Sequence, residues 1–453
     1  MDILIKNGTI VNSDSTRKAD ILISNDKIVE ISDKIDITKN CKLIDAIGKY
    51  IIPGGIDPHV HMSLPNPTGN SSDSFYTGSK AALYGGTTTI IDFVTPERGE
   101  SMLTALEKRK SEAKDTLSNY SFHVSPVEWT ENTNKEIEQC IKEGYTSFKV
   151  YLAYKNVVGL NDEEFKQVLS SVAKAGGIVT VHCEDGDKID ELRDNFVNKG
   201  KVSPEFHPLS RPAELEAIAV EKAIKFSDEA NCPLYIVHVS SALSLTHIKD
   251  AQQKGQKVYA ETCPHYLLLD DSKYLGDFKN TAPYVLSPPI RKIEDQNALW
   301  NSLADKTIQT TGTDHCPFMM NQKEVGINDF RKIPNGAGGV EHRLELLFSF
   351  GILKNRINLN KWVELTSTNS AKIFGLYPAK GIIAKGSDAD VVIWNPDIDR
   401  TISVKNHHQN CDSNIFEGFE IKGQAETVIR NGEIVIENAK MFENIEFGKL
   451  LKR

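Results

Sequence analysis

A strand–helix alternation, repeated eight times, is the feature that most constrains how this chain can fold. Each unit begins with a short run of apolar and β-branched residues, ends in polar residues, and continues into a helical pattern. Alternating β and α units place the strands in parallel, with helices crossing over between them. Eight units predict an α/β fold, a closed (β/α)8 TIM barrel, over residues 51–375. The candidate strands are Tyr50–Ile56, Thr87–Val94, Asn119–Val124, Ser147–Leu152, Ile178–Cys183, Leu234–Val239, Lys257–Thr262 and Ile308–Thr313.

A doubly wound open sheet is the alternative fold for such a pattern. That fold usually has fewer strands, and it often carries a glycine-rich phosphate loop. Neither G-x-G-x-x-G nor G-x-x-x-x-G-K-[ST] occurs in the sequence, which favours the barrel.

The two ends of the chain follow a different pattern of short alternating strands. Residues 1–50 and 376–440 share it, and we predict that together they form one small β-sandwich domain beside the barrel. Each end contains an Asn-Gly pair between strand-like runs, at Asn7-Gly8 and Asn431-Gly432, and this pair favours a tight hairpin turn. Residues 441–453 are expected to form a short polar C-terminal tail.

Charge and hydropathy limit the classes of partner. The net charge of −9 argues against a nucleic-acid binder, whose affinity normally rests on a basic surface. No apolar run approaches the roughly 18 residues that a membrane span needs, so no membrane partner is expected. The N-terminal residues lack the features of a signal peptide, and the seven cysteines are scattered without a C-x-x-C pair. We therefore expect a cytoplasmic protein with reduced thiols.

Polar residues with metal-binding side chains follow the predicted strands, where barrel enzymes keep their active sites. The first strand leads into Asp57-Pro58-His59-Val60-His61, and alternation along an extended chain puts His59 and His61 on one face. A lone H-x-H is a weak signal, because two hydrogen-bonded surface histidines would look the same. The signal strengthens because four other strand ends carry Lys149, His182, His238 and Asp314. One metal centre would account for all of these buried polar groups together.

The types of these residues indicate the metal and a modification. Four histidines and one aspartate favour zinc over magnesium or calcium. A cationic Lys149 beside metal ions is electrostatically unfavourable, whereas a carbamate formed from its neutral amine and CO₂ is carboxylate-like and can bridge two ions. We therefore hypothesise two divalent metal ions bridged by a carbamylated Lys149, that is, N6-carboxylysine.

The motifs at the strand ends resemble those of the amidohydrolase superfamily and, more narrowly, the dihydropyrimidinase/D-hydantoinase family of cyclic amidohydrolases. The likeness covers nearly the whole chain, and the motifs are specific as a set. They are Asp57-Pro58-His59-Val60-His61, Ser147-Phe148-Lys149, Val181-His182-Cys183-Glu184, Val237-His238-Val239-Ser240, Gly312-Thr313-Asp314-His315, Ser210-Arg211-Pro212, Glu261-Thr262-Cys263-Pro264 and Ser287-Pro288-Pro289.

The resemblance implies a role for each matching residue. His59, His61, Lys149 and Asp314 would hold the first metal, and Lys149, His182 and His238 the second. Asp314 would also act as the catalytic acid and base. Tyr154 would stabilise the oxyanion and bind substrate, although a tyrosine in the core is the alternative reading of that residue. Ser287 and Asn335 would bind the cyclic amide through backbone groups.

A few positions distinguish between relatives. Dihydroorotases are expected to carry an arginine where this chain has Ser63, and allantoinases resemble H-x-H-x-x-Glu-Pro where it has Leu64-Pro65. His265 stands where the family suggests glutamine. An apolar set matches the family's substrate-gating loops and suits a small uncharged ring; its members are Met62, Leu64, Phe93, Leu152 and Val158.

The resemblance therefore predicts a dihydropyrimidinase or hydantoinase that opens the cyclic amide of 5,6-dihydrouracil, dihydrothymine or a hydantoin. An allantoinase-like ureide hydrolase is the alternative enzyme. A non-catalytic scaffold similar to collapsin-response mediator proteins is the alternative from another class, but all six matching ligand positions hold competent residues. The family usually forms homotetramers, so a homotetramer is expected.

Overall fold

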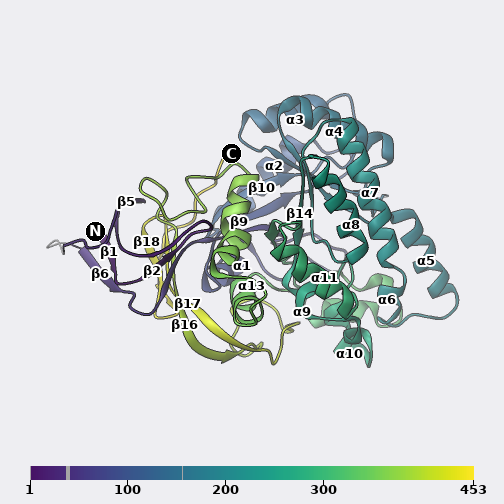
Figure 1. Ribbon diagram of the computed structural model, residues 1–453. Helices are drawn as coiled ribbons and strands as arrows, with labels where there is room; N and C mark the ends of the chain where they lie inside the picture. The colour runs from purple at the N-terminus through teal and green to yellow at the C-terminus, as the bar shows by residue number, and fades with distance from the viewer. Residues whose placement is uncertain (1, 37–40, 156) are drawn as a thin grey trace.

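The computed structural model describes residues 2–36, 41–155 and 157–453, and its centre is an eight-stranded parallel sheet rolled into a barrel (Figure 1). The strands follow one another in chain order, each hydrogen-bonded to the next. A parallel bridge between Val60 and His315 joins the first strand to the segment after the last. The predicted (β/α)8 barrel is thus confirmed. Its strands are β8 (Gly55–Val60), β9 (Thr87–Val94), β10 (Asn119–Val124), β11 (Ser147–Tyr151), β12 (Ile178–His182), β13 (Leu234–Ile236), β14 (Val258–Thr262) and β15 (Thr310–Thr311).

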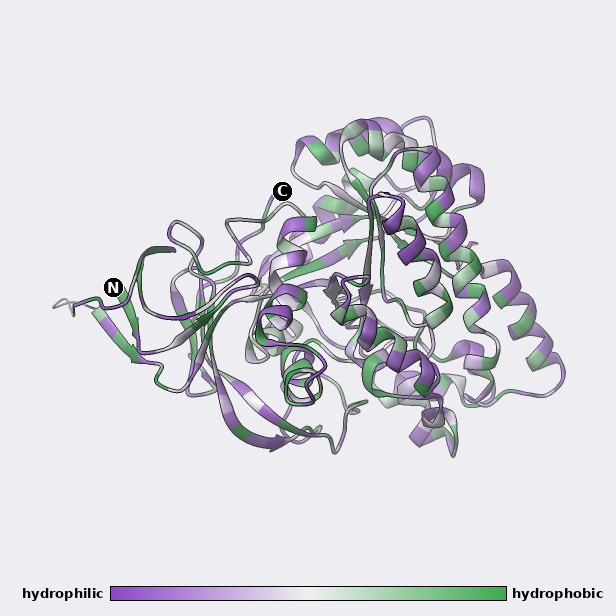
Figure 2. Cartoon of the chain, viewed as in Figure 1, coloured by the Kyte–Doolittle hydropathy of each residue, from purple (hydrophilic) through white to green (hydrophobic). Residues whose placement is uncertain are grey.

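Amphipathic helices surround the barrel, and α4 shows why they form. Asn161 caps α4 by accepting from the backbone N–H of Glu164, whose side chain accepts from the N–H of Asn161 in return. Gly176 ends the helix in the left-handed conformation, with φ of 82°. In Figure 2 the outer helices carry both hydrophilic and hydrophobic residues, as helices with one buried face do.

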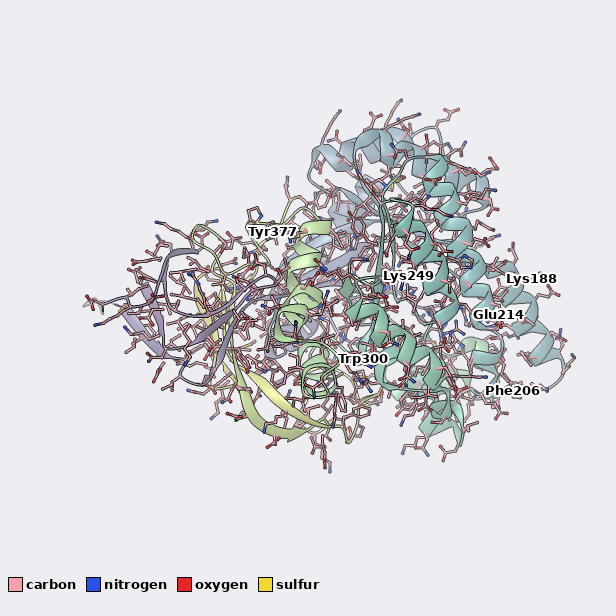
Figure 3. All side chains as sticks on the ribbon, in the orientation of Figure 1. Lys188, Phe206, Glu214, Lys249, Trp300 and Tyr377 are labelled. Carbon is pink, nitrogen blue, oxygen red and sulfur yellow. The ribbon has the colours of Figure 1, made fainter. Side chains whose placement is uncertain are left out.

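The helices have the following bounds: α1 (Phe75–Tyr84), α2 (Met102–Glu112), α3 (Thr133–Lys142), α4 (Asp162–Ala175), α5 (Gly186–Asn198), α6 (Phe206–Leu209), α7 (Ala213–Glu229), α8 (Ala242–Gln253), α9 (Pro264–Leu268), α10 (Phe278–Thr281), α11 (Ile293–Ala304), α12 (Met320–Lys323), α13 (Arg343–Leu347), α14 (Leu359–Val363) and α15 (Asn369–Ile373). Figure 3 labels Lys188 on α5, Lys249 on α8 and Trp300 on α11. Trp300 is buried, and its indole N–H donates to the carbonyl of Leu267 at 2.9 Å, which ties α11 to α9. Within the described ranges, no helix combines the length and apolar character needed to cross a membrane.

Strands from both ends of the chain build two further sheets beside the barrel, as predicted (Figure 1). Isoleucines of both sheets share one core, among them Ile5 and Ile23 from one and Ile51 and Ile393 from the other. The smaller sheet has the order β5 (Lys27–Ser32), β4 (Asp20–Ser24), β1 (Asp2–Lys6) and β6 (Cys41–Asp45). The larger has the order β19 (Lys440–Met441), β18 (Glu433–Glu437), β17 (Glu420–Arg430), β16 (Val391–Thr401), β7 (Tyr50–Pro53), β2 (Thr9–Val11) and β3 (Thr16–Lys18).

The prediction of Tyr50–Ile56 as one barrel strand was wrong. Its first part is β7, which pairs with β16 and β2 in the terminal sheet, and the barrel strand begins only at Gly55. Gly54 makes the transition possible, because a Cβ there would lie 2.0 Å from Oγ1 of Thr88. The chain therefore leaves one sheet and enters the other at a point with no room for a side chain.

The two Asn-Gly pairs behave differently. Asn431 and Gly432 have φ of 51° and 78°, and Arg430 pairs with Glu433, so the predicted hairpin between β17 and β18 is confirmed. The first pair forms no hairpin, because β1 pairs with β4 and β6 whereas β2 pairs with β3 and β7. The chain changes sheets there, and long-range pairing overrides the local turn preference.

The C-terminal residues pack along the barrel and do not form a free tail. The backbone N–H of Tyr120 donates to Lys449 at 3.0 Å, and the N–H of Leu451 donates back to Tyr120 at 2.7 Å. The N–H of Arg453 donates to Gly144, just before β11, at 2.8 Å. The segment thus lies against the N-terminal ends of β10 and β11, opposite the strand ends that carry the histidines.

Candidate metal centre

The C-terminal ends of the barrel strands bring the predicted ligands together. His59 and His61 come from β8 and the residue after it, Lys149 from β11 and His182 from β12. His238 and Asp314 follow strands shorter than the sequence predicted, since β13 ends at Ile236 and β15 at Thr311. Both residues have positive φ, 40° for His238 and 50° for Asp314. This conformation is unfavourable for residues other than glycine, and such strained residues cluster at functional sites.

His59, His61 and Asp314 form the first half of the centre. Oδ1 of Asp314 lies 3.1 Å from Nε2 of His59 and 3.0 Å from Nε2 of His61. Burial alone would raise the pKa of Asp314, but the two imidazoles outweigh it and hold that pKa well below its usual value. Within the described residues these three form the group of side chains spaced to hold a metal ion.

His182 and His238 form the second half. Nδ1 of His182 lies 3.0 Å from Nε2 of His238, and the rings of His238 and His59 are 5.3 Å apart, so the two halves adjoin. Burial lowers the pKa of both His182 and His238, which keeps them neutral at pH 7. His182 uses Nε2 to contact Glu184 at 2.8 Å, which leaves the lone pair of Nδ1 facing His238. Neutral imidazoles in this arrangement fit a divalent metal ion.

Lys149 is buried near both halves. Its side chain is about 1% exposed, and Nζ lies 4.9 Å from the ring centre of Phe93 and 5.0 Å from that of Tyr151. In the described part of the chain no carboxylate forms an ion pair with it. Burial lowers the pKa of Lys149 to about 8, although Asp314 and Glu261 act in the opposite direction. The neutral amine that carbamate formation requires is therefore accessible near neutral pH.

Buried carboxylates outside the predicted ligand set hold the centre in place. Glu261 lies at the end of β14, and its Oε1 is 2.7 Å from Nδ1 of His59. Its Oε2 accepts a hydrogen bond from the hydroxyl of Tyr235 at 2.7 Å. Asp57 accepts from the backbone N–H of His59 and from the hydroxyl of Thr313, at 3.1 and 2.6 Å. Both acids stand inside the motifs at the strand ends, but no role was predicted for them. Their signal was a carboxylate inside a buried strand, which is costly unless it is paired.

Tyr154, which the resemblance assigned to oxyanion stabilisation, lies beside the second half. Its ring centre is 5.7 Å from that of His182, and its hydroxyl accepts from Nη2 of Arg211 at 3.3 Å. Nη1 of Arg211 donates to Glu184 at 2.5 Å, so Glu184 contacts both His182 and the arginine that is hydrogen-bonded to Tyr154. Tyr154 has φ of 59°, and its carbonyl accepts from Val157, Val158 and Gly159, which stabilises the strained turn. Sequence reasoning missed Arg211 and Glu184 as parts of the site.

Ser287 and Asn335 are adjacent, although 48 residues separate them in the chain. Nδ2 of Asn335 donates to Oγ of Ser287 at 2.9 Å, and both residues are half-buried. The structure therefore brings together the two residues that the resemblance assigned to substrate binding.

The five predicted gating residues fall into different environments. Met62 is fully buried, and its sulfur fills the space that a side chain at Gly78 would need. Phe93 lies on strand β9 and not on a loop, with its ring centre 4.8 and 4.6 Å from those of His59 and His61. Leu152 is buried, whereas Leu64 and Val158 are half-buried. Phe93 therefore forms a fixed apolar wall of the metal centre.

His265 is buried on the short helix α9, next to Tyr266, with ring centres 4.1 Å apart. Its Nε2 has no hydrogen-bond partner in the described residues, and burial lowers its pKa to about 4. It is thus a neutral side chain with one unused ring nitrogen.

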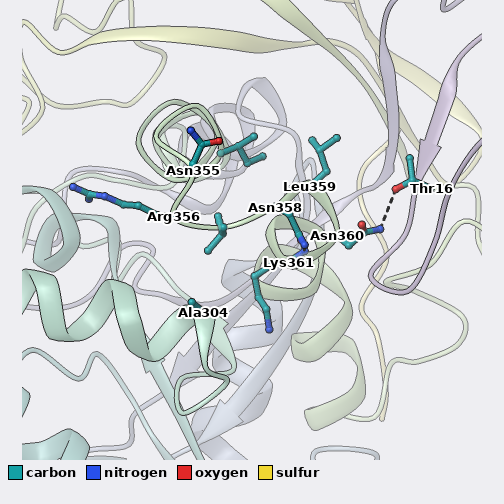
Figure 4. A pocket seen from close by; sticks show the side chains of 10 residues that line it. Thr16, Ala304, Asn355, Arg356, Asn358, Leu359, Asn360 and Lys361 are labelled. Atoms are coloured by element: carbon teal, nitrogen blue, oxygen red, sulfur yellow. Dashed lines mark hydrogen bonds between the residues drawn. The ribbon is translucent and has the colours of Figure 1, made fainter.

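A cavity of about 600 Å³ lies elsewhere, lined by none of the predicted site residues (Figure 4). Asn360, one of the residues that line it, donates to the carbonyls of Asn12 and Ser15 and to the hydroxyl of Thr16, the last at 3.0 Å. These contacts fasten α14 to the segment that carries β2 and β3 of the larger terminal sheet.

Comparison with known proteins agrees with this geometry. Residues 50–435 match the profile of the Amidohydrolase family. The chain belongs to this family. It is 42% identical to the D-hydantoinase of Geobacillus stearothermophilus, over 99% of this chain and 96% of that protein. It is 39% identical to the dihydropyrimidinase of Arabidopsis thaliana, over 99% of this chain and 85% of that protein.

A solved structure extends the similarity to three dimensions. The crystal structure of dihydropyrimidinase from Brevibacillus agri superposes with a TM-score of 0.98 at 42% identity, covering 100% of this chain and 99% of that one. Together, the full-length matches and the His/His/Asp group show a dihydropyrimidinase/hydantoinase-like cyclic amidohydrolase.

Proposed function

We propose that this amidohydrolase hydrolyses the cyclic amide bond of 5,6-dihydrouracil, dihydrothymine or hydantoins to give N-carbamoyl amino acids. The observation that carries the proposal is the convergence of four histidines, one aspartate and a buried lysine at one end of the barrel. The near-complete overlap with proteins named dihydropyrimidinase and D-hydantoinase supports the choice of ring.

The residues present fit two divalent metal ions, and we propose zinc. His59, His61, Lys149 and Asp314 would hold one, and Lys149, His182 and His238 the other, with Lys149 as a carbamate. Two observations support this assignment: the lone pair of His182 Nδ1 faces His238, and the buried Lys149 forms an ion pair with no carboxylate of the described residues. When bound, such a metal pair would supply hydroxide at neutral pH and polarise the ring carbonyl.

The side chains would then divide the remaining work. Asp314 would take the proton of the nucleophile and deliver it to the leaving amide nitrogen. The hydroxyl of Tyr154, held by Arg211, would donate to the carbonyl oxygen as negative charge develops there. Backbone groups at Ser287 and Asn335 would hold the ring amide. The half-buried Leu64 and Val158, with Phe93, would give the ring an apolar surround.

The deciding experiment follows the ultraviolet absorbance of the ring amide of dihydrouracil with zinc-loaded protein beside Asp314→Ala. Loss of absorbance with the wild type and none with the variant is the expected result. Faster opening of allantoin than of dihydrouracil would overturn the choice of substrate in favour of a ureide hydrolase. Absence of tightly bound metal, with no turnover of any ring after reconstitution, would favour a non-catalytic scaffold. A homotetrameric assembly and a cytoplasmic location remain predictions of the sequence, testable by light scattering and by fractionation.

A further inference from the structure

Two loops meet at the substrate-binding pair. One loop carries Ser287 and the other carries Asn335, and their side chains are hydrogen-bonded. A backbone bond runs parallel to that contact, from the N–H of Gly336 to the carbonyl of Val285 at 3.0 Å. The relative position of the two loops therefore sets where both predicted substrate contacts lie.

Lys323, the last residue of α12, lies behind this junction. Its side chain is about 1% exposed, and Nζ donates to three main-chain carbonyls: Pro334 and Gly336 at 3.0 Å each and Val285 at 3.4 Å. Pro334 and Gly336 flank Asn335, and Val285 precedes Ser287 by two residues. An ammonium group has three N–H donors, so its hydrogen-bonding capacity matches these three acceptors.

Among the described residues, Lys323 has no oppositely charged partner. In the part of the chain that the structure describes, no carboxylate forms an ion pair with it, and burial lowers its pKa to about 8 despite the nearby thiols of Cys411 and Cys316. An unpaired buried cation costs free energy that an apolar side chain of similar volume would not. A methionine would therefore fill this space at a lower cost in free energy. Because packing alone does not explain the lysine, its free-energy cost points to a role in the site.

We propose that Lys323 is a positioning residue that clamps the Ser287 and Asn335 loops together. It thereby fixes the relative position of the groups on these loops that bind the ring amide. What the two loops bind rests on the proposed function. That Lys323 holds the loops together rests only on its three carbonyl contacts.

A second buried lysine provides a matched control. Lys380 is about 4% exposed and pairs with Asp388 at 3.0 Å and with Asp390, beside the terminal sheet. Its replacement removes a buried ammonium just as the replacement of Lys323 does, but away from the substrate loops. The test therefore compares Lys323→Met with Lys380→Met, and Lys323→Gln provides a second variant that keeps two N–H donors if the methionine variant fails to fold.

Two measurements are needed. The first is steady-state hydrolysis of dihydrouracil by the zinc-loaded proteins, in which Lys323→Met is expected to raise KM by about tenfold or more with little change in kcat or metal content. The second is hydrogen exchange of the backbone amides, in which Lys323→Met should speed exchange around Gly336 but not in β8 or β12. Lys323→Gln should fall between wild type and Lys323→Met, and Lys380→Met should change neither KM nor exchange around Gly336.

The outcomes separate the clamp from the proposed function. Unchanged exchange around Gly336 in Lys323→Met and Lys323→Gln, or unchanged KM in both with an active wild type, would overturn the clamp. Faster exchange at Gly336 with a wild type that opens no cyclic amide would support the clamp and overturn the proposed function instead. Equal rises in KM for Lys323→Met and Lys380→Met would overturn the clamp as well, because a general loss of packing would then explain the effect.

Discussion

Nδ1 of His59 lies 2.7 Å from Oε1 of Glu261, and both side chains are fully buried. The contact makes Nδ1 the donor and directs Nε2 toward Asp314. Burial alone would lower the pKa of His59, but Glu261 and Asp314 outweigh it and raise that pKa to about 9. The same oxygen of Glu261 accepts the backbone N–H of His238 at 3.2 Å, so one carboxylate contacts proposed ligands in both halves of the centre.

Replacing Glu261 with glutamine should therefore weaken metal binding while keeping the shape of the site. Loss of such a carboxylate behind a ligand histidine typically costs about 10- to 100-fold in metal affinity. Competition with a chelator measures the affinity directly. Glu163→Gln, an exposed carboxylate on α4, is the control. Equal zinc affinity for the wild type and Glu261→Gln would contradict the role assigned to Glu261.

Lys149→Ala should lose bound metal, because the variant cannot form the carbamate that we propose bridges the two ions. A short-chain carboxylic acid such as acetate should restore part of the metal content by occupying the vacated space. Elemental analysis of the purified variant with and without the acid is the measurement, and Lys380→Ala controls for loss of a buried lysine. Full metal content in Lys149→Ala without added acid would rule out the bridging carbamate.

Tyr154→Phe should lower kcat by about 10²- to 10³-fold, the usual cost of removing one donor to a developing oxyanion. Metal content should stay unchanged, because the phenol is not among the proposed ligands. Tyr120→Phe, at the opposite end of the barrel, is the matched control and should retain full kcat. If both variants hydrolyse dihydrouracil as fast as the wild type, Tyr154 is a packing residue of the loop.

The pH dependence of stability should carry a contribution from Glu184. Burial alone would raise the pKa of Glu184, but Arg211 and His182 outweigh it and lower that pKa from 4.5 to about 2. The unfolded chain therefore binds this proton first as the pH falls. The stabilisation is fully present above pH 4.5 and is lost between pH 4.5 and about 2, at about 1.4 kcal/mol per pH unit.

Urea unfolding of metal-free wild type and Glu184→Gln from pH 4.5 downward tests this contribution. The free energy of unfolding of the wild type should fall more steeply with decreasing pH than that of the variant. Glu163→Gln should follow the wild type. Parallel curves for wild type and Glu184→Gln would show that Glu184 titrates normally.

The sequence alone determined the barrel, the contribution of both termini to the second part of the molecule, and the six residues at the strand ends. These features are local: strand runs, helical patterns and the residue that follows each strand. Where a local preference met long-range pairing, the prediction failed. The Asn7-Gly8 turn and the strand Tyr50–Ile56 are the examples, because pairing with distant strands decided both.

Only the tertiary structure decided which residues support the ligands. Glu261 contacts His59 across 202 residues of sequence, Arg211 reaches Tyr154 across 57, and Lys323 binds the carbonyls of two separate loops. Nothing in the local pattern around these residues distinguishes a charge that holds a ligand from one that pairs for stability. The distinction depends on which side chains the closed barrel brings within hydrogen-bond distance, and that is set by the packing of the whole chain.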